Sequence, residues 1–280
     1  MTTQHPPTPN DDPFADAPVD PKLSDYVPPV PVAQWINGDK KLAKLGGIAA
    51  KGGIFLPNDK IKKFLTATGQ EEFNVPGELI EVTFAEGNTE AGFGATSLEI
   101  AVIKTRFRWV QKMSDGTRQY SPRRAYKKDA TPKMIGNLQV LVVAKGTETF
   151  PFVIAFTGRN SQEFERVFSA LNKEVMPIIN EGRKGTPIPR MAIWFTLEAK
   201  AQEKAQENFT TMITPPHFYL PQSLTIDYLR QRYVGNDNLK ALQEINQKFE
   251  SWTREWDNAP TDGEHAIAES NNATGGDEGK

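Results

Sequence analysis

The alternation of apolar and polar positions along the chain predicts a protein built mainly of β-strands. Short strands are expected from Gly53 to Leu56 and from Leu79 to Phe84. The longest strand candidate runs from Ser97 to about Met113. Asp115-Gly116 is typical of a two-residue hairpin turn, so a partner strand is expected to begin near Thr117. This part of the chain is thus predicted to form one long hairpin.

Two further strands are expected to be buried on both faces. Leu138 to Ala144 and Phe152 to Phe156 are nearly continuous runs rich in β-branched and aromatic residues. Apolar residues also alternate from Met191 to Lys200, and a last β segment is expected from Asn208 to Thr214. By contrast, Gly92-Phe93-Gly94 is interpreted as the tip of a flexible loop.

Three helices are expected beside these strands. Asn160 is a candidate N-cap with Glu163 three residues later, and the apolar stripe that follows is expected to end at Pro177. The other two helices are predicted from Ser223 to Tyr233 and from Asn238 to Trp256. The last of them carries one apolar stripe, formed by Leu239, Leu242, Ile245, Phe249, Trp252 and Trp256. Such a stripe can pack against the body of the protein or against a second copy, which would make a homo-oligomer.

The number of strands and the position of the helices predict an α+β fold. The preferred architecture is a β-barrel-like core of the oligonucleotide-binding (OB) type with an internal helix and two C-terminal helices. A barrel of this type presents a concave face and mobile loops to single strands. One globular domain is expected over residues 32–256, with the β-rich core reaching to about residue 214.

Both ends of the chain differ in composition from the domain. Residues 1–31 hold nine of the 21 prolines, and residues 257–280 carry six carboxylates against one lysine. Segments that bury so little apolar surface are expected to be disordered. The leader lacks the apolar core of a signal peptide, no run approaches a membrane span, and the chain has no cysteine. We therefore expect a cytoplasmic protein with no membrane partner.

Charge is strongly segregated in a chain whose formal net charge is only −2. The stretch from Lys104 to Lys133 holds ten Lys or Arg residues against Asp115 and Asp129, and aromatic residues are interleaved with them. Cations neutralise phosphates and release their counterions, while aromatic rings stack on unpaired bases. This combination predicts a non-enzymatic, sequence-tolerant protein that binds single-stranded DNA, or RNA, through the hairpin.

A period of two divides the first arm of the hairpin into two faces. One face is expected to carry the cations Lys104, Arg106 and Arg108. The other is expected to carry Ile103, Thr105, Phe107 and Trp109. Because this second group is mostly apolar, Phe107 and Trp109 are interpreted as core residues rather than as stacking platforms.

The second arm would carry cations and aromatic rings on one face, provided that Pro122 does not interrupt the strand. Its even-numbered residues include Arg118, Tyr120, Arg124, Tyr126 and Lys128. Tyr120 and Tyr126 are the preferred stacking residues. The full set of candidate nucleic-acid-binding residues is Lys104, Arg106, Arg108, Lys112, Arg118, Tyr120, Arg123, Arg124, Tyr126, Lys127 and Lys128.

A β-rich core with a basic, aromatic surface, followed by a helix and an acidic C-terminus, resembles the single-stranded DNA-binding proteins of phages and plasmids. The resemblance lies in this organisation, and it implies a role in DNA replication or recombination. The chain departs from the common bacterial form, because its last residues, from Gly275 to Lys280, lack the terminal aromatic residue that recruits partners there. The acidic tail is instead expected to compete with DNA for the basic face.

Two other classes of function stay open. The chain could be a structural or adaptor protein of a phage or mobile element, whose basic face meets an acidic protein. It could also be a metal-dependent nuclease, with Glu78, Glu81 and Glu99 holding magnesium. His217 is the one histidine inside the expected domain, so no histidine pair is available there for a metal or a catalytic triad. We expect neither a metal nor a cofactor.

Overall fold

A computed structural model describes most of the expected domain. The described residues are 30–38, 47–72, 77–83, 89–147, 150–181, 184–201, 203–204 and 212–253. The leader up to residue 29 and the segment from residue 254 onward, which includes Trp256 and the acidic tail, lie outside them. Within the described part of the chain, none of the helices is both long and apolar enough to cross a membrane.

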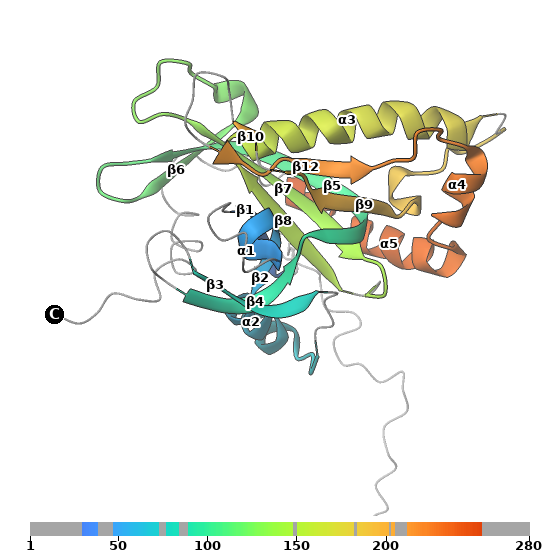
Figure 1. Cartoon of the computed structure of the whole chain (residues 1–280), viewed down its shortest axis with the longest axis horizontal. Helices are drawn as coiled ribbons and strands as arrows, with labels where there is room; N and C mark the ends of the chain where they lie inside the picture. The colour runs from blue at the N-terminus through green and yellow to red at the C-terminus, as the bar shows by residue number, and fades with distance from the viewer. Residues whose placement is uncertain are drawn as a thin grey trace, which may run out of the picture.

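Most strands belong to one large mixed sheet (Figure 1). They follow the order β12-β9-β5-β7-β8-β1-β2-β4-β3, and β6 pairs with β5 outside this path. Among the described strands, β1 and β8 run parallel and the other neighbours run antiparallel. The strands of this sheet are β1 Val32–Asn37, β2 Gly52–Pro57, β3 Glu78–Thr83, β4 Thr89–Ala95, β5 Ser97–Lys112, β6 Arg118–Pro122, β7 Ile135–Ala144, β8 Pro151–Thr157, β9 Phe195–Ala199 and β12 Pro216–Tyr219.

Helices and a short ribbon complete the fold. The ribbon pairs β10 Glu203–Lys204 with β11 Met212–Ile213. The α-helices are α1 Gly47–Lys51, α2 Asn58–Thr68, α3 Arg159–Asn180, α4 Ile226–Gln231 and α5 Asn236–Lys248. Two 3-10 helices, η2 Arg123–Ala125 and η3 Arg190–Ala192, follow β6 and precede β9.

The expected α+β class is confirmed, but the expected barrel closure is wrong. In the described residues β12 and β3 stand at the two ends of the strand order and do not pair with each other. A period-two pattern identifies strands, but closure depends on their tilt and stagger, which the pattern does not contain. The described sheet is therefore open, and an OB-type fold is not confirmed.

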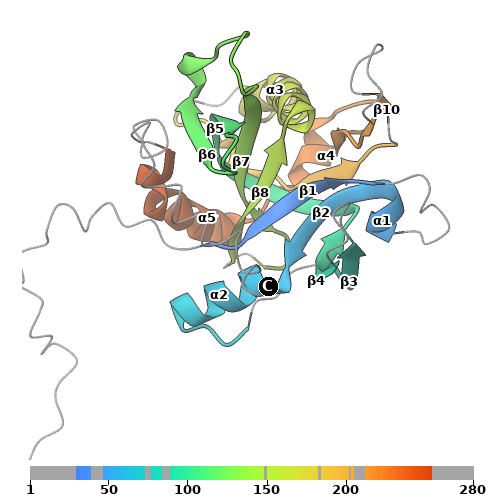
Figure 2. The same ribbon diagram turned by 90° about the vertical axis from the view of Figure 1, so that its left-hand side faces the viewer.

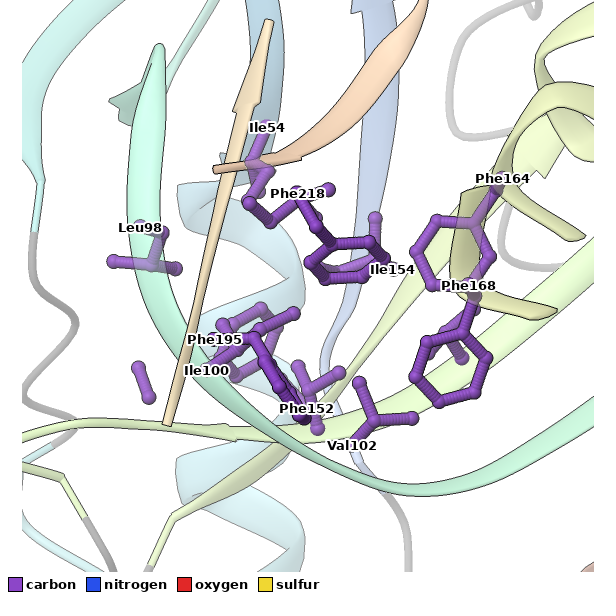
Figure 3. Packing of buried hydrophobic residues seen from close by; sticks show 14 of the residues in the cluster. Ile54, Leu98, Ile100, Val102, Phe152, Ile154, Phe164, Phe168, Phe195 and Phe218 are labelled. Atoms are coloured by element: carbon purple, nitrogen blue, oxygen red, sulfur yellow. The ribbon is translucent and has the colours of Figure 1, made fainter. Parts of the chain in front are cut away.

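Helices cover both faces of the central strands (Figure 2). On one face, Phe164 and Phe168 of α3 point toward Phe218 of β12 (Figure 3), and the ring centres of Phe164 and Phe218 are 5.6 Å apart. On the other face, Phe249 after α5 belongs to the same buried cluster as Leu141 of β7. This arrangement confirms that β7 and β8 are buried on both faces, and it explains why both are nearly continuous apolar runs.

The long strand β5 contains a β-bulge between Val102 and Lys104. Before the bulge, Val102 belongs to the α3 cluster and Ala101 to the α5 cluster. Ile103 is the extra residue, and it also packs in the α5 cluster. Its expected grouping with Thr105 is wrong, because an inserted residue reverses the alternation of faces. Beyond the bulge the odd-numbered residues of β5 face α3 and the even-numbered ones face α5.

Helix α3 extends beyond both predicted limits. It follows Gly158 instead of beginning with an N-cap at Asn160, and it continues through Pro177 to Asn180. Pro177 cannot donate a backbone hydrogen bond, which is why the pattern placed the end there. Ile179 is buried against the sheet, so tertiary packing stabilises the last turn.

The two expected C-terminal helices are present and shorter than predicted. Helix α5 ends at Lys248, and helical structure resumes over residues 250–253. The apolar stripe packs against the sheet of the same chain through Leu242, Ile245, Phe249 and Trp252. The described residues of this stripe are therefore covered by the same chain.

The sequence pattern does not indicate β1, α2, β4 or β12. The expected loop at Gly92-Phe93-Gly94 is instead part of strand β4. A Cβ atom at Gly92 would lie 2.4 Å from the carbonyl oxygen of Leu56, and one at Gly94 would lie 2.2 Å from a side-chain carbon of Ile80. These glycines thus allow the neighbouring strands β2 and β3 to approach β4 closely, and they do not mark a turn.

A partly buried hydrogen-bond network joins the end of β1 to α3 and to the segment before β12. The Oδ1 of Asn37 accepts from the Nδ2 of Asn160 at 3.0 Å and from the backbone N–H of Thr214 at 2.8 Å. The hydroxyl of Thr214 in turn accepts from the backbone N–H of Gly38 at 2.9 Å, and the backbone carbonyl of Thr214 accepts from the indole N–H of Trp35 at 2.8 Å. Because buried donors are costly without an acceptor, the Asn37 amide holds three segments together.

We expect Asn37→Ala to lower the free energy of unfolding by about 1–2 kcal/mol, because two partly buried donors lose their acceptor. Gln243→Ala removes an exposed amide from α5 and should change stability by less than about 0.5 kcal/mol. Urea unfolding of both variants measures the difference. Equal transition midpoints would show that this network does not stabilise the fold.

Candidate nucleic-acid interface

Two cations on the first arm of the hairpin hold the end of α5. Lys104 donates through Nζ to the carbonyl of Phe249 at 2.8 Å, and Arg106 donates to the carbonyl of Trp252 at 3.1 Å. The guanidinium of Arg106 lies 4.0 Å from the centre of the Trp252 ring and donates twice to Gln139. Carbonyls at the end of a helix lack intrahelical partners and favour cations. These two candidates therefore serve the packing of α5.

Arg108 and Tyr120 contact each other. Arg108 is 6% exposed, and its guanidinium lies 3.3 Å from the centre of the Tyr120 ring. Tyr120 pairs with Val110 in the β5–β6 register, so it shares a face of the hairpin with Arg108. A buried guanidinium stacked on a ring stabilises the hairpin itself. Both candidates are accordingly less open to a ligand than the sequence suggests.

The two tyrosines that were expected to share a face lie on opposite faces. Strand β6 ends at Pro122, where η2 begins to redirect the chain. Tyr120 contacts Arg108 on the α5 face, whereas Tyr126 packs against Trp109, whose side chain is on the α3 face. The shared face required an uninterrupted strand, and a proline without a backbone N–H ends the ladder.

An aromatic row runs along the α3 face of the hairpin. The rings of Phe107 and Trp109 meet edge to face with centres 5.0 Å apart, and the ring of Tyr126 lies 4.5 Å from that of Trp109. The guanidinium of Arg123 lies 4.5 Å from the centre of Phe107. Tyr126 is 52% exposed at the outer end of the row. Trp109 is half-buried and is therefore not the fully enclosed core residue that was expected. Its ring packs against that of Tyr126 and supports it.

The loop after β6 is anchored to the hairpin and to α3. The indole of Trp109 donates to the carbonyl of Arg123 at 3.0 Å, and Gln111 donates to the carbonyl of Pro132 at 2.6 Å. The side chain of Arg123 forms an ion pair with Glu165 of α3. Because both ends of the loop are fixed, its remaining cations are presented to solvent.

Exposed cations cover the tip of the hairpin and this loop. They are Lys112, Arg118, Arg123, Arg124, Lys127, Lys128 and Lys133. Within the described residues, Arg123 is the one member of this group that forms an ion pair. The carboxylates nearby in sequence are Asp115 and Asp129. Hydrogen bonds from the hydroxyl and backbone N–H of Thr117 lower the pKa of Asp115, which keeps its charge within the turn.

A groove of about 520 Å³ lies between the hairpin and α3. Its buried floor is apolar and includes Leu138, Phe164 and Phe168. The charged residues that line it are Arg123, Glu165, Lys173 and Arg190. Sequence reasoning did not find Lys173 and Arg190, because they lie on α3 and η3, far along the chain from the basic stretch.

Arg190 is the most enclosed cation of this groove. It donates to the carbonyl of Ile103 at 3.5 Å, and its guanidinium lies 5.3 Å from the centre of the Phe168 ring. Burial lowers the pKa of Arg190. In the described part of the chain, no carboxylate lies within 4.0 Å of its guanidinium. Its charge is thus compensated mainly by dipoles and by an aromatic ring.

A second hollow, of about 300 Å³, lies beside β12 along another stripe of α3. It contains His217, and burial, together with the charge of Lys200, lowers the pKa of this histidine. Among the residues with described positions, no three His, Asp or Glu side chains gather as a metal site would require. This hollow accordingly shows no arrangement for metal-dependent chemistry.

The three carboxylates considered for a nuclease do not come together. Glu99 lies on β5 and forms ion pairs with Lys145, at 2.9 Å, and with Arg232. Glu78 and Glu81 lie on β3, at the end of the strand order. A magnesium ion needs its carboxylates around one point, so these residues do not form such a site.

Comparisons with known proteins do not assign the chain to a family. No family model matches it, and neither a curated protein nor a solved structure shows significant similarity to it.

The two kinds of cation in the hairpin should respond differently to removal. Arg106→Ala should lower the free energy of unfolding by about 1.5–3 kcal/mol, because hydrogen bonds from a charged group to Trp252 and Gln139 are lost. Arg124→Ala removes an exposed cation and should change stability by less than about 0.5 kcal/mol. Denaturant unfolding of both variants checks this contrast. If they are equally stable, Arg106 does not hold α5 in place.

Proposed function

We propose that this protein binds single-stranded nucleic acid, with DNA as the main ligand, without reading sequence and without catalysis. The observation that carries the proposal is the half-exposed ring of Tyr126, which is supported by Trp109 and belongs to a loop rich in exposed cations. A base can stack on the exposed face of this ring while the flanking phosphates meet Arg124 and Lys128. Neither contact distinguishes one base from another.

Unpaired bases fit this surface better than a duplex does. Stacking on Tyr126 requires a base whose face is free, and duplex bases are already stacked on their neighbours. Duplex readers commonly place a helix in the major groove, whereas this surface consists of a hairpin tip, η2 and a loop. Stacking and phosphate contacts do not depend on the 2′-hydroxyl, so RNA is a second ligand of the same surface.

The proposal does not require the OB-type barrel that was expected from the sequence. A hairpin with an anchored loop is sufficient to present a ring and several cations to a strand. The role in DNA replication or recombination that the overall layout implies belongs to this proposal, as does a cytoplasmic location. An acidic protein partner would use the cations but would gain nothing specific from a supported, exposed ring.

Removing charge from the loop should weaken binding and reduce its salt dependence. Each phosphate contact on a single strand contributes about 0.7 to the slope of log affinity against log salt. Arg124→Ala combined with Lys128→Ala should therefore lower that slope by about 1.4. Fluorescence anisotropy with labelled oligo-dT at several salt concentrations measures it.

A matched double variant controls for net charge. Lys62→Ala combined with Lys63→Ala removes two exposed lysines from α2, at the opposite end of the molecule from the hairpin (Figure 2). This control should keep the slope of the unmodified protein. If the two double variants bind alike, the loop is not the contact surface, and absence of oligo-dT binding by the unmodified protein would favour an acidic protein partner.

The second test addresses stacking. Tyr126→Ala should weaken oligo-dT binding by about 1–3 kcal/mol, and Tyr126→Phe should retain most of the affinity, because the ring face carries the contact. Tyr219→Ala is the control, since Tyr219 is 51% exposed on β12 and Tyr126 is 52% exposed. Anisotropy titrations compare the three variants. Equal losses for Tyr126→Ala and Tyr219→Ala would remove stacking at Tyr126 from the proposal.

A further inference from the structure

We infer that the groove between α3 and the hairpin is a binding subsite for one phosphate group of a nucleotide, with Arg190 and Lys173 as its main ligand-binding residues. This inference rests on the proposed function and adds a second contact point to it. The shared chemistry is a phosphate oxygen, which can come from the phosphodiester of a strand or from the phosphate of a free nucleotide.

The described part of the chain compensates the charge of Arg190 only in part. A guanidinium has five N–H donors, and Arg190 uses one of them in a long hydrogen bond of 3.5 Å to Ile103. It forms no ion pair with any described carboxylate, although it is largely enclosed by the groove. A charge that leaves water is stabilised by an opposite charge and by hydrogen bonds to its remaining donors. A bound phosphate would supply both.

The charged residues that line the groove carry a net positive charge. Arg123, Lys173 and Arg190 face the single carboxylate Glu165, and Arg123 already pairs with it. Lys173 is exposed and forms no ion pair among the described residues. Two positive charges thus remain for a ligand. An arginine fork and a lysine point charge are the side chains that proteins use most for phosphate.

The groove is large enough for a small ligand and is continuous with the aromatic row. A volume of about 520 Å³ is within the range of sites that hold a small molecule. Arg123 lines the groove and also lies over Phe107, the inner ring of the row that ends at Tyr126. Thr105 lines the groove four residues before Trp109 on β5, which corresponds to roughly 13 Å of strand. A nucleic-acid strand with one base stacked on Tyr126 can therefore continue along the aromatic row toward Arg190.

The test uses the full-length protein and two probes. Isothermal titration calorimetry with dTMP measures the groove directly, and thymidine, which lacks the phosphate, is the ligand control. Arg190→Gln and Lys173→Gln should each weaken dTMP binding by roughly tenfold, as expected for loss of a charge-assisted contact. Glu165→Gln should strengthen it several-fold, because it removes the one competing negative charge. Lys248→Gln, an exposed lysine on α5, is the matched charge control and should bind like the unmodified protein.

Opposite shifts for Lys173→Gln and Glu165→Gln would support the subsite even if Arg190→Gln failed to fold. Oligo-dT titrations of the same variants identify the source of the phosphate. If the variants change the affinity for both probes, the phosphate can come from a free nucleotide or from a nucleic-acid strand. If they change the affinity for oligo-dT alone, it comes from a nucleic-acid strand. If the unmodified protein binds oligo-dT and the three groove variants match it with both probes, the subsite is wrong while the proposed function stands. If the unmodified protein does not bind oligo-dT, the proposed function fails, and the dTMP titrations still decide the groove.

Discussion

The β-bulge at Ile103 determines which side chains of β5 meet which helix. A single inserted residue reverses the alternation of faces along the rest of the strand. Before the bulge, Ile100 and Val102 belong to the α3 cluster and Ala101 to the α5 cluster. After the bulge, the side chains of Lys104 and Arg106 contact the end of α5, and those of Phe107 and Trp109 lie on the α3 face. The placement of the aromatic row and of the packing cations on opposite faces of the hairpin thus depends on this irregularity.

The basic stretch consequently contains two kinds of cation with different physical roles. The first kind contacts other parts of the protein and comprises Lys104, Arg106 and Arg108. Carbonyls near the end of α5 or aromatic rings stabilise the positive charges of these side chains. The cations of the hairpin tip and the following loop face water, where a mobile counterion is their alternative partner. Only this second kind can release counterions when a polyanion binds. The affinity of the proposed interface therefore comes from fewer cations than the sequence count suggests.

Helix α3 connects the packing of the protein to its proposed ligand surface. Its first turns enter the partly buried network through Asn160, and its middle supplies Phe164 and Phe168 to the core. The adjacent stripe carries Glu165 and Lys173 along the groove. A rigid helix anchored by its apolar face can hold such groups in fixed positions, whereas a loop would have to order them on binding. This explains how one element positions both the anchored loop and the groove.

The sequence by itself determined the strands with strong patterns, the position of the hairpin turn, the buried character of β7 and β8, and the amphipathic stripes of α3 and α5. These features follow from local spacing, because faces of strands and helices repeat at fixed periods. The expected two-residue turn is a three-residue loop, because the backbone N–H of Met113 donates to the carbonyl of Thr117 across residues 114–116. The sequence also located the basic stretch and, on the first arm of the hairpin beyond Ile103, separated its even-numbered from its odd-numbered residues. What it could not provide was the bulge, the run of α3 past Pro177, or the strand position of Gly92 and Gly94. Each of these depends on which distant segment lies alongside, and packing overrides local preference there. Only the tertiary structure decided that Tyr126 is the exposed ring and that Lys173 and Arg190 join Arg123 at one groove, since chain segments far apart in sequence meet there.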